Sequence, residues 1–487
     1  MTAIPHISVY WMKKANTGSP TCHSEERSDV RISINKDILK LAIPSILANI
    51  TVPIVGMVDI AVAGHLDTQA ATMIGGIAIG TMLFDLLYWN FGFLRVGTGG
   101  LTAQAFGKGD RKECATIFAR AIGISLACAL ALIAIQWIFV KAALLLVDCT
   151  PEVRALASQY FFIRIWAAPA TLILMAFKGW FIGMQDSVSP MLTDLTVNGM
   201  NVLMSFILAL GIKSVGYEGM GFPGIAAGTV AAQYSGLLMS ILLAVFKYRR
   251  NTFSALSLSD LKGVFKGSET RRFFVMNTDL FIRSLCFIAI YIGFTVISAR
   301  YGDLLLAVSS IMMKLLMIFS YFTDGFAYAG EAMTGKYIGA KDGLRLSQTV
   351  KWTFVWSMGI AVIFMGIYQF AGVPLLRMMT SDATVVEASK EYLPWLLLMP
   401  VIGCAAFTWD GIYIGATASK AIRNSMLWAV VGFAAVWFVG IVCLNLLSPD
   451  ATDYGRIAMH ILMAAYFAHL LARTIYLSAK YRKVVHI

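Results

Sequence analysis

"AIGISLACALALIAIQWIFV", residues 121–140, is a run of twenty residues without a single charged side chain. A second uncharged run, "GFPGIAAGTVAAQYSGLLMSILLAVF", covers residues 221–246. About 20 apolar residues in a helix cross the hydrocarbon core of a bilayer. Because backbone groups in lipid find no water to bond, such segments must be helical. The runs therefore predict an all-α polytopic membrane protein.

The composition of the whole chain agrees with a membrane location. Hydrophobic residues make up 58% of the 487 residues and charged residues only 14%, whereas a soluble domain is about half apolar and a quarter charged. The net charge of +12 would suggest nucleic acid in a soluble protein. In a membrane protein it is explained by basic loops that face the cytoplasm. We therefore expect lipids around the chain and no nucleic-acid partner.

Apolar stretches separated by short polar breaks predict twelve transmembrane helices. Their approximate spans are 37–65, 70–106, 112–140, 152–185, 189–212, 221–247, 272–300, 304–338, 346–373, 386–417, 422–448 and 455–479. The longest polar break divides them into two sets of six. The expected organisation is a polar, disordered cytoplasmic leader at 1–35, a six-helix lobe at 36–247, a cytoplasmic linker at 248–271 and a second six-helix lobe at 272–487.

The two lobes share motifs at one constant offset. "AFGKGDRK" holds Gly107 and "YIGAKDGL" holds Gly339, while "GWFIGMQ" holds Gly179 and "GIYIGAT" holds Gly411. Both pairs are 232 residues apart (339 − 107 and 411 − 179). Since each unit has an even number of helices, the copies enter the membrane in the same direction. We expect parallel repeats related by a pseudo-twofold axis along the membrane normal.

Basic residues in the loops indicate the orientation. The leader, the breaks near 108–112, 247–272, 336–351 and 420–423 and the C-terminal tail together hold about two dozen Lys and Arg. The opposite connections hold Lys141, Arg154, Lys213, Arg300, Arg377, Lys390 and Arg456. The excess of positive charge predicts that both termini lie in the cytoplasm.

Asp59 is the principal candidate for function. It lies in "ANITVPIVGMVDIAVAGHL", residues 48–66, and a carboxylate at such a depth costs about 3 kcal/mol. Burial disfavours its charged form, so it can take up and release a proton. Pro53, six residues earlier, removes a backbone donor and is a candidate hinge. The alternative is that Asp59 is permanently paired and only holds helices together.

Further polar residues gather in the first lobe. Asn198, Asn201 and Ser205 fall on one face of a predicted helix. They are expected to form a polar network around a cavity, or simply to make interhelical hydrogen bonds. Asp85, Tyr88 and Arg95 lie together in "FDLLYWNFGFLRVG"; Asp85 and Arg95 are expected to be paired structurally. These residues are assigned to the same network.

The second lobe has its own polar set, in which Lys314, Asp324, Glu331 and Asp410 are the candidates. The first three share one predicted helix and form either a second protonatable site or a neutralised structural cluster. Asp279 and Arg283 are four residues apart, which favours a local ion pair. Position 291 (59 + 232) is Tyr291, so the repeat has no carboxylate that matches Asp59.

The chain carries none of several motifs that are typical of enzymes and of nucleotide-binding proteins. The sequence has no GxxxxGK[ST] phosphate loop, HExxH or GxSxG. The seven cysteines are scattered singly and show neither metal-site nor disulfide spacing. We expect a protein that is not an enzyme, with no metal and no cofactor other than a coupling ion, H⁺ or Na⁺.

Several strings resemble a known family. "VDIAVAGHL", "FGFLRVGTGGLTAQAFGKGD", "DGFAYAGEAMTGKYIGAKD" and "DGIYIGATASKAIRNSML" are similar to multidrug and toxic compound extrusion (MATE) transporters. "GFLR" and "DGFAYA" resemble the subgroup named for the DNA-damage-inducible protein F. The resemblance covers about residues 36–480 and implies a V-shaped exporter with two lobes. It also implies that Asp59 matches the residue that takes the coupling ion in many members.

The resemblance implies antiport of cationic or amphipathic compounds against H⁺ or Na⁺ by alternating access, in the cytoplasmic (inner) membrane of a bacterium. The alternative is a flippase for polysaccharide or lipid-linked precursors from the same superfamily. Many members carry Asn-x-x-x-Asp where this chain has Asn201 and Ser205. The absent second carboxylate favours protons over a metal cation. We expect a monomer.

Overall fold

A computed structural model describes residues 20–64, 66, 70–145, 147, 149–212, 216–255, 263–265, 268–380, 382–447 and 453–485. Within these ranges the side chains of residues 20–29, 52–57, 64, 70, 71 and 269 are not described. Apart from one isolated bridge between Ile212 and Tyr217, the described residues form no strand. The predicted all-α fold is confirmed.

From α2 onward, the helices of the first lobe follow the predicted spans closely. They are α1 (Pro20–Gly64), α2 (Ala70–Trp89), α3 (Phe93–Gly107), α4 (Arg111–Leu145), α5 (Pro151–Arg164), α6 (Ala168–Gly183), α7 (Val188–Leu210) and α8 (Phe222–Tyr248). Single turns of 3₁₀ helix join α2 to α3 and α5 to α6, so each of these pairs crosses the membrane as one unit.

The helices of the second lobe repeat this arrangement. They are α10 (Ser268–Ala299), α11 (Asp303–Gly339), α12 (Gly343–Met379), α13 (Ala383–Lys390), α14 (Leu393–Gly415), α15 (Ser419–Leu447) and α16 (Tyr454–Val484). The predicted helix 386–417 is interrupted between α13 and α14. Among the described residues, eleven helical segments are long and apolar enough to cross a membrane, and α1 precedes all of them.

The first helix is longer than the sequence indicates. It begins at Pro20, whereas we expect a disordered leader as far as residue 35 and a helix from about residue 37. The expected start is therefore corrected. No glycine or proline lies between Pro20 and Pro44, so nothing local interrupts the helix once α1 has formed. The hinge predicted at Pro53 falls within residues 52–57, whose side chains lie outside the described part, and remains a prediction.

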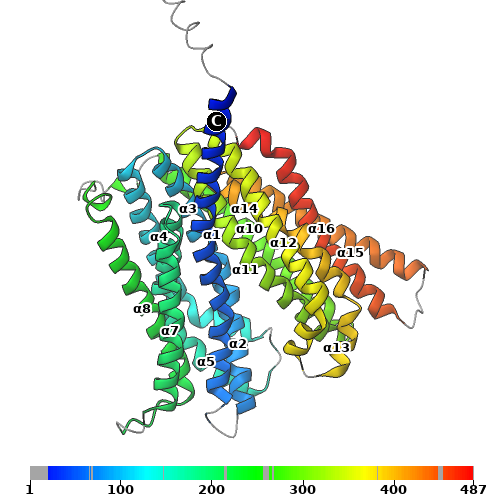
Figure 1. The fold of residues 1–487 in the computed structure, drawn as a ribbon. Coiled ribbons are helices and arrows are strands. Elements are labelled where there is room, and N and C mark those ends of the chain that lie inside the picture. Colours follow the sequence, from blue (N-terminus) through cyan, green and yellow to red (C-terminus); the bar gives the residue numbers. More distant parts are fainter. Residues whose placement is uncertain are drawn as a thin grey trace, which may run out of the picture.

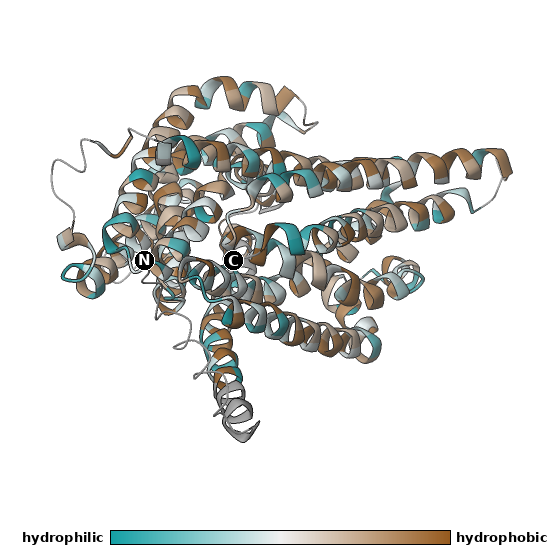
Figure 2. Cartoon of the chain, turned by 90° about the horizontal axis from the view of Figure 1, so that it is seen from above, coloured by the Kyte–Doolittle hydropathy of each residue, from teal (hydrophilic) through white to brown (hydrophobic). Residues whose placement is uncertain are grey.

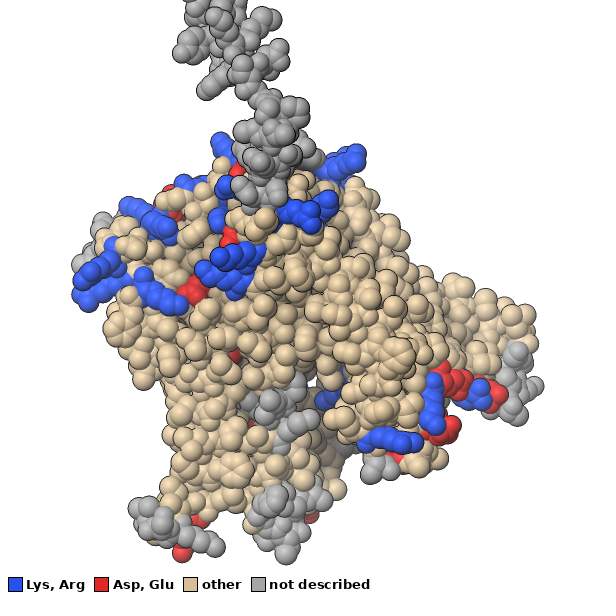
Figure 3. Space-filling view, viewed as in Figure 1, with Lys and Arg blue, Asp and Glu red and all other residues tan. Residues whose placement is uncertain are grey.

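The two lobes pack together at one end and separate at the other (Figure 1). A core cluster shared by both lobes joins Trp180 and Phe181 of α6 to Tyr337 of α11 and Tyr413 of α14. We call this end, where α1 begins and α3, α6, α11 and α14 finish, the closed end. The remaining core is divided into one cluster in each lobe. The space-filling view shows the molecule hollowed between the lobes at the opposite, open end (Figure 3).

Charge and hydropathy are distributed as in a membrane protein. Hydrophobic residues cover most of the helices seen from above (Figure 2). On the visible face, Lys and Arg gather at the closed end, and the fewer charges beyond it are of both signs (Figure 3). Exposed Lys247, Arg249 and Arg250 at the end of α8 belong to this basic rim. The asymmetry is the one expected when the closed end faces the cytoplasm.

The repeat recorded in the sequence is visible as reciprocal contacts between the lobes. A Cβ added to Gly107 would lie 1.9 Å from the carbonyl oxygen of Lys336, and one added to Gly339 would lie 2.1 Å from that of Gln104. The residues of these contacts correspond at the offset of 232 (336 − 104 and 339 − 107). Exchanging the two lobes therefore turns the Gly107 contact into the Gly339 contact, as expected about a pseudo-twofold axis between α3 and α11. Only glycine lets the two backbones come this close.

Candidate functional site

Asp59 lies inside the first lobe and is held by two hydroxyl groups. Its side chain on α1 is 3% exposed. Tyr160 Oη of α5 donates to Asp59 Oδ2 at 3.3 Å, and Ser205 Oγ of α7 donates to Oδ1 at 3.4 Å. Three helices thus enclose the carboxylate. Both donors are neutral, so hydrogen bonding does not fix its charge in the way a direct ion pair would.

Arg164 provides a positive charge near Asp59, with the Tyr160 side chain between the two. Its Nη1 donates to Tyr160 Oη at 3.0 Å and to Thr81 Oγ1 at 3.5 Å, and the guanidinium lies 4.8 Å from the centre of the Phe84 ring. Arg164 interacts electrostatically with Asp59 without a direct hydrogen bond between the two side chains. The cation is therefore linked to the carboxylate through the Tyr160 hydroxyl.

Tyr160 and Arg164 are absent from the predicted site. The sequence does carry a signal for them, because an arginine in an apolar helix needs a partner and the two residues are four apart, on one helix face. Nothing in the sequence indicates that this face points at Asp59, since the contact joins residues 101 positions apart.

The predicted polar stripe of α7 faces α1 and α8. Ser205 reaches Asp59, the Asn198 amide donates to Thr51 Oγ1 of α1, and the Asn201 amide donates to Thr229 Oγ1 of α8 at 3.0 Å. Asn201 Oδ1 is buried without a hydrogen-bond partner among the described residues, and the Asn201 side chain also interacts with Asp59. Ser205 and Asn201 thus lie beside the carboxylate, whereas Asn198 joins α7 to α1 two helical turns away from it.

The structure separates the other candidates of the first lobe. Arg95 Nη1 pairs with Glu331 Oε2 at 3.1 Å, across the boundary between α3 and α11, so Arg95 is paired with a neighbouring helix. Asp85 is exposed. Tyr88 stacks on Phe84 at 5.4 Å. Asp85 and Arg95 lie ten residues apart on a nearly continuous helix, whose turns carry them to different neighbours.

In the second lobe the local ion pair expected between Asp279 and Arg283 is wrong. Asp279 Oδ1 pairs with Arg423 at 2.6 Å, whereas Arg283 pairs with Asp410 Oδ2 at 2.6 Å. Asp410 also receives Arg473 at 2.5 Å. A spacing of four offsets two side chains by about 40°, which lets one lean toward α15 and the other toward α14.

The three candidates on α11 do not form one cluster. Glu331 is fully buried and paired with Arg95. Lys314 is exposed and Asp324 half-buried, and the described residues provide neither with an ion pair. Asp324 interacts electrostatically with Arg95. The sequence left open whether this set is a second protonatable site or a neutralised structural cluster. Of the three residues, only Glu331 is neutralised by an ion pair.

Asp59 differs from the other buried carboxylates. Among the described residues, the buried acidic side chains are those of Asp59, Asp279, Glu331 and Asp410. The last three each form a direct salt bridge to arginine, and Asp59 forms none. A carboxylate already paired with a guanidinium resists protonation, because that would leave the cation uncompensated. Asp59 is thus the buried carboxylate best able to change its charge.

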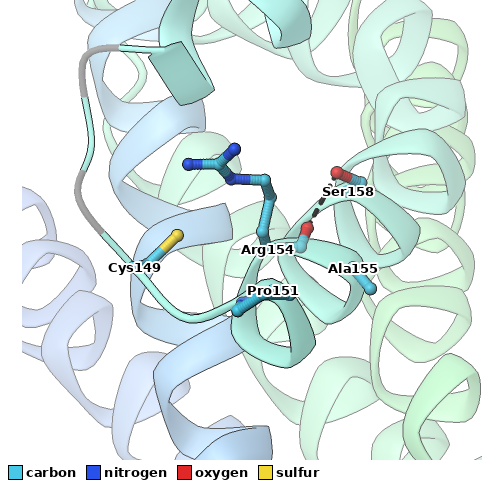
Figure 4. Close-up of a pocket in the computed structure, with 5 residues that line it drawn as sticks. All are labelled: Cys149, Pro151, Arg154, Ala155 and Ser158. Carbon is cyan, nitrogen blue, oxygen red and sulfur yellow. Dashed lines mark hydrogen bonds between the residues drawn. The ribbon is translucent and has the colours of Figure 1, made fainter.

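A separate cavity of about 490 Å³ lies at the start of α5, lined by Cys149, Pro151, Arg154, Ala155 and Ser158. Figure 4 shows the Arg154 side chain extending away from the helix, while the Ser158 hydroxyl turns back to donate to the Arg154 carbonyl at 2.8 Å. No residue of this cavity bonds to Asp59. Within the described residues, no group of three or more His, Cys, Asp or Glu could hold a metal ion.

Comparison with known proteins assigns relatives to the chain. A family model described as MatE matches residues 44–207 and 280–439. DNA damage-inducible protein F of Escherichia coli strain K12 is 33% identical over 404 residues, which cover 82% of this chain and 85% of that protein. A probable multidrug resistance protein NorM of Photorhabdus laumondii is 24% identical over 417 residues, covering 83% and 86% of the two chains.

Solved structures agree in fold. A MATE crystal structure in a bent conformation superposes with a TM-score of 0.78 at 14% identity and covers 94% of this chain and 98% of its own. An outward-facing multidrug resistance transporter of the MATE family gives 0.78 at 15% identity, covering 93% and 96%. At such low sequence identities the similarity concerns the fold, which is the two-lobed arrangement of this chain.

Proposed function

The chain belongs to the MatE family of multidrug and toxic compound extrusion transporters, and from this premise we propose that it exports organic cations or amphipathic compounds in exchange for protons. The observation that carries the proposal is the state of Asp59. It is buried, it is held by the hydroxyls of Tyr160 and Ser205, and it has no direct ion pair. Such a group can gain and lose a proton as the transporter changes conformation.

Arg164 supports protons rather than sodium as the coupling ion. Its guanidinium lies 3.0 Å from the Tyr160 hydroxyl that contacts Asp59. A fixed guanidinium beside the carboxylate would repel a metal ion held there. A proton, by contrast, neutralises the carboxylate and adds no separate charge. The Asn201 oxygen without a partner offers one further ligand, but the other groups that contact Asp59 are hydroxyls.

One proton per cycle provides enough energy. Its movement down a membrane potential yields roughly 2.3 kcal/mol per 100 mV, and each pH unit adds about 1.4 kcal/mol. Since about 1.4 kcal/mol corresponds to a tenfold concentration ratio, one carboxylate can maintain a gradient of roughly a hundredfold for an uncharged amphipathic compound. For a monovalent cation the exchange moves no net charge, so only the pH difference contributes, about tenfold per pH unit.

Everted membrane vesicles test the proposal. Vesicles that contain the protein are acidified inside in sodium-free buffer, and tetraphenylphosphonium, a permanent organic cation, is added. We expect proton release evoked by the cation, and its loss in Asp59→Asn. Asp303→Asn is the control because Asp303 is an exposed residue at the start of α11. Full activity of Asp59→Asn would refute the role of Asp59, and an absolute requirement for sodium would refute proton coupling.

The orientation forms part of the same proposal. The basic closed end would face the cytoplasm, the hollow between the lobes would open to the outside, and both termini would be cytoplasmic. In a variant whose seven native cysteines are replaced by serine, cysteines placed singly at Arg250 and at Arg377, which are exposed, test it in whole cells. An impermeant maleimide should label the second and not the first; the reverse pattern would invert the topology.

A further inference from the structure

Asp85 presents an unpaired carboxylate to the space between the lobes. It is exposed and forms no hydrogen bond or ion pair with the described residues. Trp89, four residues later on the same face of α2, contacts Phe287 and Tyr291 of α10 at ring distances of 6.1 and 5.2 Å. This face therefore points at the second lobe. Tyr291 also interacts electrostatically with Asp85.

Arg164 lies between this carboxylate and the buried one. On one side it donates to Tyr160, whose hydroxyl donates to Asp59. On the other side its Nη1 donates to Thr81 Oγ1 at 3.5 Å, one helical turn before Asp85 on α2, and it interacts electrostatically with Asp85 and Tyr88. A guanidinium stays charged at every pH at which cells work. One permanent cation is thus shared by two carboxylates, one inside the lobe and one at its surface.

We propose that Arg164 transmits the protonation state of Asp59 to a cation-binding site at Asp85, an inference that rests on the proposed function. When Asp59 is ionised, Arg164 is held on the Tyr160 side and Asp85 is free to bind a cationic compound. When Asp59 takes up a proton, the anion that holds Arg164 is lost. The guanidinium then pairs with Asp85 and displaces the cation. Protons from outside would thereby release the exported compound.

The other groups around these residues do not titrate in the range concerned. Tyr88 and Tyr160 have hydroxyls whose ordinary pKa lies near 10. The neighbours of Asp59 on α7 are Asn201 and Ser205, which do not ionise. Lys314 of α11, in the second lobe, interacts electrostatically with Asp85. Asp59 and Asp85 are the carboxylates of this group. Titration of Asp85 itself would leave a pH effect in Arg164→Gln, whereas transmission from Asp59 would not.

Equilibrium binding of tetraphenylphosphonium to the purified full-length protein in lipid nanodiscs tests the inference at pH 8 and pH 5.5. We expect wild type to bind about tenfold more weakly at pH 5.5. Arg164→Gln should bind with the same Kd, within about twofold, at both pH values, because no guanidinium remains to pair with Asp85 when Asp59 is protonated. Asp85→Asn should bind weakly at both. Arg154→Gln, on the same helix but in the separate cavity of Figure 4, should retain the tenfold difference.

The outcomes separate this inference from the proposed function. If Arg164→Gln retains the tenfold pH effect, Arg164 transmits nothing, although export by wild type would still stand. If wild type neither binds nor exports the cation, the proposed function itself fails. Should Arg164→Gln not fold, Tyr160→Phe replaces it, since loss of the bridging hydroxyl should reduce the pH effect to less than about threefold. An unchanged effect in Tyr160→Phe would overturn the inference equally.

Discussion

The Arg95 guanidinium and the Glu331 carboxylate form a 3.1 Å ion pair that joins the two lobes. The carboxylate is fully buried, and the arginine also lies 4.4 Å over the ring of Tyr328. Val96 and Ala332, the chain neighbours of the pair, belong to the shared core of the closed end. The pair therefore stabilises the arrangement in which that end is shut and the lobes separate at the other.

Glu331→Gln should destabilise the closed end, because it leaves the Arg95 cation buried without its partner, at a cost of about 3 kcal/mol. Thermal unfolding of the purified protein should show a lower Tm. A double-mutant cycle with Arg95→Gln checks the origin of the effect. The double variant should lose less than the sum of the single variants, and strict additivity would mean that the pair contributes nothing.

Gly339→Ala should abolish transport. Its Cβ would stand 2.1 Å from the Gln104 carbonyl oxygen, so α3 and α11 could no longer meet at the closed end. Gly359→Ala on α12 is the matched control, since nothing lies within 4 Å of a Cβ there. That change should leave transport intact and even favour the helix by up to about 1 kcal/mol. Equal activity of the two variants in the vesicle assay would contradict the steric argument.

Tyr160→Phe should alter how transport depends on pH. The variant keeps the ring and its packing but removes the hydroxyl that donates to Asp59 and accepts from Arg164. A hydrogen bond to a carboxylate favours its charged form. Without this bond, the pH at which transport is half-maximal should move upward. Rates of uptake into everted vesicles over pH 5 to 9 would show the shift, and an unchanged midpoint would exclude a role for the hydroxyl.

Asp186, in the turn between α6 and α7, should make stability depend on pH. It accepts hydrogen bonds from the Ser189 backbone and hydroxyl at 3.0 and 2.6 Å and from Lys247 at 3.0 Å. Burial opposes its ionisation, yet these bonds hold the pKa of Asp186 below its usual value. A lowered pKa stabilises the fold above the unfolded value, near 4, and that contribution is lost as the pH falls through the folded pKa.

Asp186→Asn should therefore lower Tm more at pH 7 than at pH 3. Thermal unfolding in detergent across this range would measure both. Ser189→Ala, which removes only the hydroxyl, should lower Tm at pH 7 by less than Asp186→Asn does. A loss of Tm that is the same at both pH values would show that the ionised form of Asp186 is not what stabilises the turn.

The fold could be predicted from the sequence because its determinants are local. Uncharged runs of about 20 residues specify membrane helices, and the offset of 232 between Gly107 and Gly339 reveals the repeat. Asp59 could also be selected, since a carboxylate in an apolar helix is conspicuous without knowledge of its neighbours. The start of α1 was not predicted correctly, because the polar residues ahead of the apolar stretch do not mark where the helix begins.

Partners were decided only by the tertiary structure. Arg95 meets Glu331 across 236 positions, and Asp279 meets Arg423 across 144 rather than Arg283 across four. Sequence spacing shows that two side chains share a helix face, but the packing of helices determines which face meets which. The same holds for Tyr160 and Arg164, which stand beside Asp59 because α5 packs in the same lobe as α1 and α7, a fact that no local pattern contains.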